Sequence, residues 1–170
     1  RNCLLRNGVT SDGKAVLDVF NRTHEETDYL LTYSDENRFT ASQEADFLQR
    51  KTDSANNVEI IAVVDDVVAG TAGIDALGMR DKIKHRAVFG IAITKEFWGL
   101  GIGKYLMEAC IECAREAGYL QLELEVVAEN ERAVEMYRRA GFIEYGRNPK
   151  AFRLRTGEYQ ELIDMRLELK

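Results

Sequence analysis

Three glycines at alternate positions, Gly99, Gly101 and Gly103, join an apolar run to a helical pattern and constrain the fold of this chain more than any other feature. The apolar run, residues 88–94, is nearly continuous, which is typical of a strand buried on both faces. From Ile102 onward, apolar residues recur at intervals of three and four, which predicts a helix that packs on a core. We therefore expect a buried strand to enter a helix through a glycine-rich turn.

Such a turn is suited to binding an anion. Glycine lets the backbone turn tightly and lets its N–H groups come close to a ligand. The first amides of a helix have no partners within the helix and carry a partial positive charge. The turn therefore predicts a site for a phosphate or a diphosphate.

Spacing separates the known phosphate-binding motifs. A P-loop needs glycine where this chain has Trp98, and Ser or Thr where it has Tyr105, so the P-loop is excluded. The dinucleotide fingerprint needs glycine in place of Lys104. Because Glu123 lies at about the right distance for the acidic residue of that fingerprint, it stays a weaker alternative. The remaining candidate is the diphosphate loop of acyltransferases that use coenzyme A.

The rest of the chain predicts a mixed order of strands and helices. We expect strands at residues 2–7, 58–64, 67–73, 88–94, 120–127, 142–145, 151–154 and 159–169, with helices after residues 10–12 and from residues 42, 103 and 130. Residues 142–145 and 151–154 form either one strand or two, with Asn148-Pro149 as the interruption between them. This order predicts an α+β fold, a mixed α/β sandwich with a largely antiparallel central sheet flanked by helices.

A second block of residues follows the glycine turn. Its pattern consists of Leu122, Leu124, Val126, Asn130, Ala133, Tyr137, Gly141 and Phe142. Together with Trp98-Gly-Leu-Gly101-Ile-Gly103, this block resembles the GNAT superfamily of N-acetyltransferases, and within it the branch of ribosomal-protein alanine and small-amine or amino-acid N-acetyltransferases. The two blocks span residues 88–142, about a third of the chain. The departure is Trp98, where the family usually has Gln or Arg.

The resemblance implies a GNAT-like acyl-CoA N-acyltransferase fold and direct transfer from acetyl-CoA in a ternary complex, without a metal. The residues implied to bind the cofactor are Ile91, Ala92, Ile93, Gly99, Leu100, Gly101, Ile102, Gly103, Lys104 and Asn130. Gly90 predicts a bulge or a close backbone approach in the strand that would follow the pantetheine arm. Lys104, Arg138 and Arg139 are candidates for the adenosine phosphates, with solvated helix charges as the alternative. Asn130 is also expected to cap a helix.

Two residues carry the catalytic roles that the resemblance implies. Tyr137 stands at the family's tyrosine position, where the phenol protonates the coenzyme sulfur; the alternative is an aromatic that packs on the buried face of a helix. Glu125 stands at the position of a glutamate base, which would act through water; the alternative is a solvated strand carboxylate. Glu123, on the same predicted strand face, is the natural control for Glu125.

Composition narrows the class of protein. The 170 residues suit one domain, and the formal net charge of −6 disfavours general nucleic-acid binding and favours a cationic substrate. We see no apolar window long enough for a membrane span and no signal-like leader. An odd number of cysteines, three, argues against disulfides and for a cytoplasmic location. Cys110 and Cys113 are expected to be small core residues, and His24 and His85 lack companions for a metal.

Three functions follow from this interpretation. The first is an enzyme that acetylates a small-molecule primary amine, such as an amino acid or a polyamine-like compound. The second is a protein N-terminal or lysine acetyltransferase, and the third is a non-catalytic acyl-CoA-binding domain. Glu25, Glu26, Asp28 and Tyr29 are candidates to line the acceptor site, with a solvated surface as the alternative. Whether the chain forms a homodimer is left open.

Overall fold

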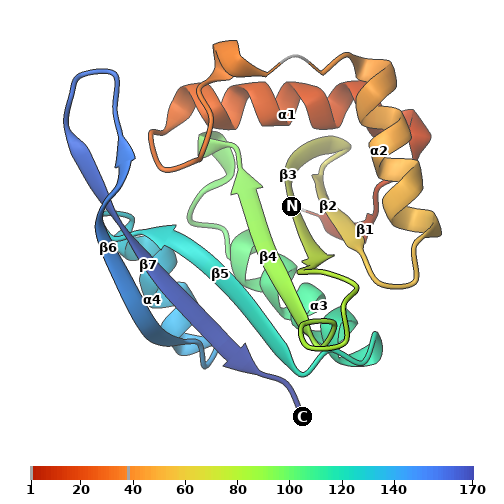
Figure 1. Cartoon of the computed structure of the whole chain (residues 1–170). Coiled ribbons are helices and arrows are strands. Elements are labelled where there is room, and N and C mark those ends of the chain that lie inside the picture. The colour runs from red at the N-terminus through yellow and green to blue at the C-terminus, as the bar shows by residue number, and fades with distance from the viewer. Residues whose placement is uncertain (1, 38) are drawn as a thin grey trace.

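The computed structural model describes residues 2–37 and 39–170, which form a sheet with helices on both faces (Figure 1). The strands are β1 (Cys3–Asn7), β2 (Val58–Val64), β3 (Val67–Ala76), β4 (Arg86–Ile93), β5 (Gln121–Val127), β6 (Ile143–Arg153) and β7 (Tyr159–Glu168). The helices are α1 (Gly13–Glu26), α2 (Ala41–Asp53), α3 (Ile102–Glu116) and α4 (Glu131–Arg139). Short 3-10 segments are η1 (Thr10–Asp12), η2 (Ser34–Glu36) and η3 (Lys95–Phe97).

The spatial order of the strands is β1-β2-β3-β4-β5-β7-β6, and among the described strands only β4 and β5 are parallel neighbours. This confirms the predicted mixed α/β fold with a largely antiparallel sheet. Successive side chains of β2 point to opposite faces of the sheet, and each face is covered by different helices. Ile60 and Ala62 belong to the larger core with α3, whereas Ile61 packs with Val16 of α1 and Leu48 of α2.

β4 and β5 diverge, and this divergence creates the gap on which the site depends. They pair only from Arg86 to Val88 on β4 and from Gln121 to Glu123 on β5, although both strands continue further. In Figure 1 their starting ends lie close together and their arrowheads lie apart. The edges that face each other beyond Val88 and Glu123 have no strand partner across the gap. Since backbone polar groups need partners, such a gap suits an extended ligand that pairs like an added strand.

An ion pair holds the closed end of this gap. The Arg86 guanidinium donates to Glu123 through Nε at 2.5 Å and through Nη2 at 2.5 Å. The Glu123 side chain is 8% exposed and that of Arg86 is 32% exposed. The hydrogen bond from Arg86, more than any other contact, lowers the pKa of the Glu123 carboxyl, which therefore stays ionised at neutral pH.

Two expectations need correction, and one open alternative is decided. The strand β4 is not buried on both faces, because Val88 and Gly90 are exposed. The register of β3 against β4 continues through Gly90 without a shift, so of the two alternatives the bulge is wrong and a close backbone approach stays a prediction. For residues 142–145 and 151–154, where one strand or two was expected, the single strand is confirmed. β6 runs from Ile143 to Arg153, and its irregular register between Asn148 and Phe152 accommodates Pro149.

None of the helices formed by the described residues has the length and apolar character that crossing a bilayer requires. The described cysteines are free thiols, and Cys110 is fully buried on α3. Burial raises the pKa of the Cys110 thiol to about 12, which confirms its assignment as an unreactive core residue.

Candidate active site

The glycine turn forms the amino-terminal end of α3, as the sequence predicts. Gly99 has φ +79° and Gly101 has φ +81°, backbone conformations that strain other residues. Gly101 is the N-cap of α3, and no side chain caps this helix start. The first hydrogen bond of the helix joins the Tyr105 N–H to the Gly101 carbonyl at 3.2 Å. The preceding amides, those of Ile102, Gly103 and Lys104, therefore remain available to an anion.

Gly103 brings three elements together behind this turn. A Cβ at Gly103 would lie 3.2 Å from Met136 Sδ of α4 and 3.3 Å from Ile93 Cδ1 of β4. Both distances are tighter than ordinary packing, so a side chain here would require the Met136 and Ile93 side chains to shift by a few tenths of an ångström. The end of β4, the start of α3 and one face of α4 thus meet at the third glycine. Leu100, by contrast, is 49% exposed at the tip of the turn.

Trp98 anchors the turn and positions two cations. Its indole N–H donates to the Ile93 carbonyl at 2.8 Å. The Arg132 guanidinium lies 5.7 Å and the Lys95 ammonium 5.9 Å from the indole ring centre. Arg132 also reaches the turn itself, because its Nη2 lies 3.6 Å from the position of a Cβ at Gly99. An aromatic side chain thus stands where the family has a polar one, and it holds a guanidinium beside the glycine turn.

Sequence reasoning missed Arg132. Of the cations that it named, Lys104 lies within 4.0 Å of Glu108, Arg138 pairs with Glu144 at 3.6 Å, and Arg139 pairs with Glu135 at 3.0 Å. Arg132, in contrast, forms no ion pair with the described residues. Its place in the first turn of α4, two residues after Asn130, was the available signal, but contact with Trp98 depends on how α4 packs against the turn.

The three predicted pantetheine residues form the open edge of β4. Ile91, Ala92 and Ile93 pair with β3 on one side, opposite residues 72, 71 and 70, and β5 does not pair with them on the other. All three are half-buried. Ile91 and Ile93 pack against the larger core, so Ala92 points to the opposite face. Apart from the Ile93 carbonyl, which accepts from the Trp98 indole, the backbone groups on this open edge have no strand partner and suit the amides of a ligand.

Tyr137 lies on α4 with its ring packed against two phenylalanines. The ring centres of Phe89 and Phe142 lie 6.1 Å and 5.8 Å from that of Tyr137, both edge to face. No group in residues 2–37 and 39–170 forms a hydrogen bond with its hydroxyl. Burial raises the pKa of the Tyr137 phenol well above its usual range, so the phenol keeps its proton at neutral pH. Phe89 is the first residue of β4 beyond its pairing with β5, which places the ring beside the gap.

Glu125 lies on the opposite face of the sheet from Tyr137. Leu124 and Val126 belong to the larger core that contains Tyr137, and alternation turns Glu125 away from it. Glu125 is exposed and stands opposite Asp164 of β7. Glu123, its control on the same face, is buried and paired with Arg86. Of the two carboxylates, Glu125 is therefore the one that can exchange protons with water.

Asn130 occupies the N-cap position of α4, as predicted, but its side chain makes no capping hydrogen bond. Its backbone explains the difference: ψ is +64°, whereas an N-cap residue usually has the extended conformation that aims its side chain at the helix amides. The half-buried carboxamide thus remains available to a ligand.

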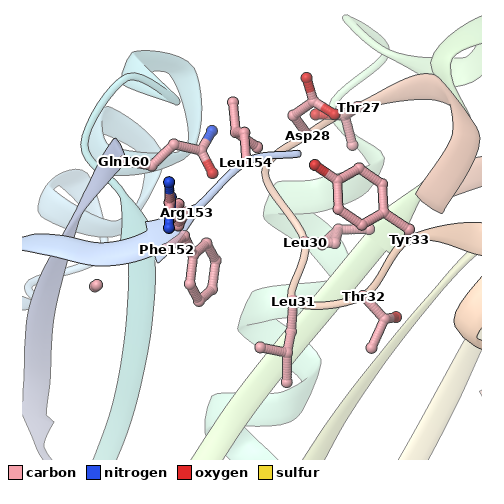
Figure 2. A pocket seen from close by; sticks show the side chains of 11 residues that line it. Thr27, Asp28, Leu30, Leu31, Thr32, Tyr33, Phe152, Arg153, Leu154 and Gln160 are labelled. Atoms are coloured by element: carbon pink, nitrogen blue, oxygen red, sulfur yellow. The ribbon is translucent and has the colours of Figure 1, made fainter. Parts of the chain in front are cut away.

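A pocket of about 160 Å³ opens on the face of the sheet that carries Glu125 (Figure 2). It lies between the connection from α1 to α2 and the β6–β7 hairpin. Its lining consists of Thr27, Asp28, Leu30, Leu31, Thr32, Tyr33, Ala151, Phe152, Arg153, Leu154 and Gln160. Of the acidic stretch proposed from sequence, only Asp28 lines this pocket.

A clasp joins the two walls of the pocket. The Arg155 guanidinium donates to Asp35 through two hydrogen bonds of 2.9 Å. The Arg155 backbone N–H donates to the Tyr33 hydroxyl at 3.0 Å, and its guanidinium lies 4.0 Å from the Tyr33 ring centre. These residues are about 120 positions apart in the chain, so no local pattern could predict the contact.

Comparison with known proteins agrees with this geometry. The model of the acetyltransferase (GNAT) family matches residues 18–142. The chain is 31% identical over 118 residues to the L-amino acid N-acetyltransferase AaaT of Escherichia coli (strain K12), covering 69% of this chain and 72% of that protein. An acetyltransferase of the GNAT family from Streptococcus pneumoniae has a TM-score of 0.94 and 27% identity, covering 99% of this chain and 100% of that one.

A further solved structure contains the cofactor. YncA of Salmonella typhimurium, a putative acetyltransferase solved with acetyl-CoA, has a TM-score of 0.88 at 16% identity, covering 100% of this chain and 95% of that one. Because the identity is low, this structural likeness supports the fold alone. The family match over residues 18–142 and the AaaT relative show that the chain belongs to the GNAT family and is an acetyl-CoA-dependent N-acetyltransferase.

Proposed function

We propose that residues 1–170 form a single catalytic domain that transfers the acetyl group of acetyl-CoA to the primary amine of a small molecule. The observation that carries this proposal is the gap between β4 and β5. It is flanked by the phenol of Tyr137 on one face of the sheet, and by Glu125 and the pocket of Figure 2 on the other. A group in the gap is thus accessible to an acid from one side and to an acceptor from the other.

The residues present fit acetyl-CoA. The amides that begin α3 suit the diphosphate, and Gly99 and Gly101 have conformations that a side chain would strain. The open edge at Ile91–Ile93 offers backbone groups for the amides of the pantetheine arm. Arg132, held by Trp98, adds a positive charge beside the turn. Bound acetyl-CoA supplies an activated thioester.

The chain's own residues would move the protons. In this mechanism Tyr137 donates its proton to the departing thiolate. Its raised pKa keeps the phenol protonated at neutral pH until that step. Glu125, exposed on the acceptor face, accepts a proton from the ammonium, with which it forms a direct hydrogen bond. A base matters most for an alkyl amine of pKa ~10.4, because deprotonation at neutral pH costs about 4 kcal/mol.

The pocket favours a small acceptor over a protein chain. Its volume of about 160 Å³ is small, and the clasp of Arg155 on Asp35 and Tyr33 ties its two walls together. A pocket of this size suits a small amine better than a segment of protein chain. The AaaT relative, an L-amino acid N-acetyltransferase by name, is consistent with a small amine.

Thiol release from acetyl-CoA, measured with a panel of small amines, amino acids and peptides, tests the proposal. We expect release that depends on a small amine and is slower with peptides of the same terminal group. Release that needs no amine, or tight acetyl-CoA binding with no release in any reaction, would contradict it and favour a binding domain.

A further inference from the structure

Gln160 of β7 is a buried polar side chain without a partner. It is 3% exposed, and its Oε1 atom forms no hydrogen bond with the described residues. Among the buried side-chain oxygen and nitrogen atoms of those residues, only one other, Thr32 Oγ1, also lacks a hydrogen-bond partner. Both residues line the pocket of Figure 2. Because buried polar groups in proteins are nearly always hydrogen-bonded, an unpaired carbonyl at a pocket wall indicates a ligand that donates to it.

The direction of the side chain agrees with that indication. Figure 2 shows the Gln160 carboxamide extending from the β7 side toward the connection between α1 and α2. Gln160 stands opposite Phe152 in the register of β6 and β7, and both line the pocket. Leu30, Leu31 and Leu154 add apolar surface to the same walls. The pocket thus combines a hydrocarbon lining with a carbonyl acceptor.

The register of β5 and β7 sets the distance from this acceptor to the proposed base. Glu125 stands opposite Asp164, and Gln160 precedes Asp164 by four residues, an even number that keeps it on the same face of the sheet. At roughly 3.3 Å per residue, Gln160 lies about 13 Å along the strand from Glu125. Hydrogen bonds of about 3 Å at both ends leave about 7 Å for the ligand, which equals about six bonds of an extended chain.

We infer that the acceptor is an elongated primary amine with a second hydrogen-bond donor, a hydroxyl or an ammonium group, about six bonds from the reacting nitrogen. The inference rests on the proposed acetyl transfer. The reacting amine lies near Glu125, an apolar chain follows the pocket wall, and the distal donor binds Gln160 Oε1. Asp28, an exposed carboxylate at the same pocket, and the net charge of −6 favour ammonium over hydroxyl.

Four amines of defined length test this inference. Pentylamine, 5-aminopentan-1-ol and 1,5-diaminopentane share the chain length and differ in the distal group, while ethanolamine has a hydroxyl that is too close. We expect kcat/KM at least about tenfold higher for 5-aminopentan-1-ol and 1,5-diaminopentane than for pentylamine or ethanolamine. Equal values for pentylamine and 5-aminopentan-1-ol would overturn the inference and leave the proposed function intact. If none of these amines or those of the wider panel is acetylated, the proposed function itself fails.

Variants of Gln160 link the preference to the residue. Gln160→Met keeps the length and removes the polar atoms, so the preference for 5-aminopentan-1-ol over pentylamine is expected to disappear. Gln160→Glu is expected to raise the preference for 1,5-diaminopentane over 5-aminopentan-1-ol. Glu161→Gln, on the opposite face of β7, is the control and keeps the wild-type ratios. An unchanged ratio in Gln160→Met, with a melting temperature no lower than wild type, would show that water alone binds Oε1 and would overturn the inference.

Discussion

Replacing Tyr137 by phenylalanine separates the proposed chemistry of this residue from its packing. The phenyl ring preserves the edge-to-face contacts with Phe89 and Phe142. The hydroxyl that is removed has no hydrogen-bond partner among the described residues, so no buried group is left unpaired. We therefore expect the free energy of unfolding to change by less than about 0.5 kcal/mol.

The effect on turnover is expected to be much larger. A positioned general acid contributes a factor of roughly 10² to 10⁴, and a factor of 10² corresponds to about 2.7 kcal/mol of activation free energy. The kcat of Tyr137→Phe should thus fall at least about 100-fold at saturating acetyl-CoA and amine. Affinity for coenzyme A should stay the same, because the proposed diphosphate site lies at the start of α3 and not on this ring.

A second buried tyrosine provides the matched control. Tyr119 and Tyr137 are both 6% exposed, but the Tyr119 hydroxyl donates to the Asn56 carbonyl at 2.9 Å. Tyr119→Phe should therefore lose about 1 kcal/mol of stability and keep its kcat, the reverse of Tyr137→Phe. Steady-state thiol release and chemical denaturation measure the two quantities. A Tyr137→Phe enzyme whose kcat stays within about threefold of wild type would refute the assignment and leave Tyr137 a packing residue.

Three further predictions concern the cofactor, the base and the fold. Arg132→Ala should weaken coenzyme A binding at least about tenfold, more at low salt than at high salt, as measured by the fluorescence of Trp98, the single tryptophan. Glu125→Gln should lower kcat with an alkyl amine, measured by thiol release, whereas an intact rate would remove Glu125 from the mechanism. The lowered pKa of Glu123 contributes stability above its unfolded pKa, near 4.3, that is lost as pH falls through the folded pKa. Arg86→Met should thus destabilise the fold by about 2 kcal/mol at pH 7 and by less at pH 4, as measured by urea denaturation. The expected loss at pH 7 is no larger because Arg86 is one-third exposed, so that solvent screens the ion pair.

Much of the fold was predictable because its signals are local. The apolar alternation of residues 120–127 fixes which side chains of β5 enter the core, and β5 spans Gln121–Val127. Gly118 and Gly141 mark the ends of α3 and α4, with φ values of +88° and +104° that favour glycine. Such patterns depend on a residue and its near neighbours, so one sequence suffices to recognise them.

The features that the sequence did not predict, or predicted wrongly, lie where distant segments of the chain meet. Lys51 of α2 is 5% exposed and pairs with Glu59 at 2.9 Å and Asp75 at 3.0 Å, a buried contact that no helical pattern indicates. Exposure of Val88 and Gly90 likewise depends on which part of the sheet α1 covers. The acceptor pocket combines residues 27–33 with residues 151–154 and 160. Each of these outcomes is a property of the assembled sheet rather than of a segment.

The two proposed catalytic residues lie on opposite faces because side chains alternate along a strand. In β5, Leu124 and Val126 face the core that contains Tyr137, so Glu125 between them has to lie on the opposite face of the sheet, the face on which the pocket opens. A one-residue slip of β5 against β7 would exchange these faces and bury the carboxylate beside the phenol. The antiparallel register, with Glu125 opposite Asp164 and Val126 opposite Ile163, excludes that arrangement. The separation of acid and base across the gap is therefore a consequence of strand register, and it places the phenol among the side chains of the core and the carboxylate on the exposed face.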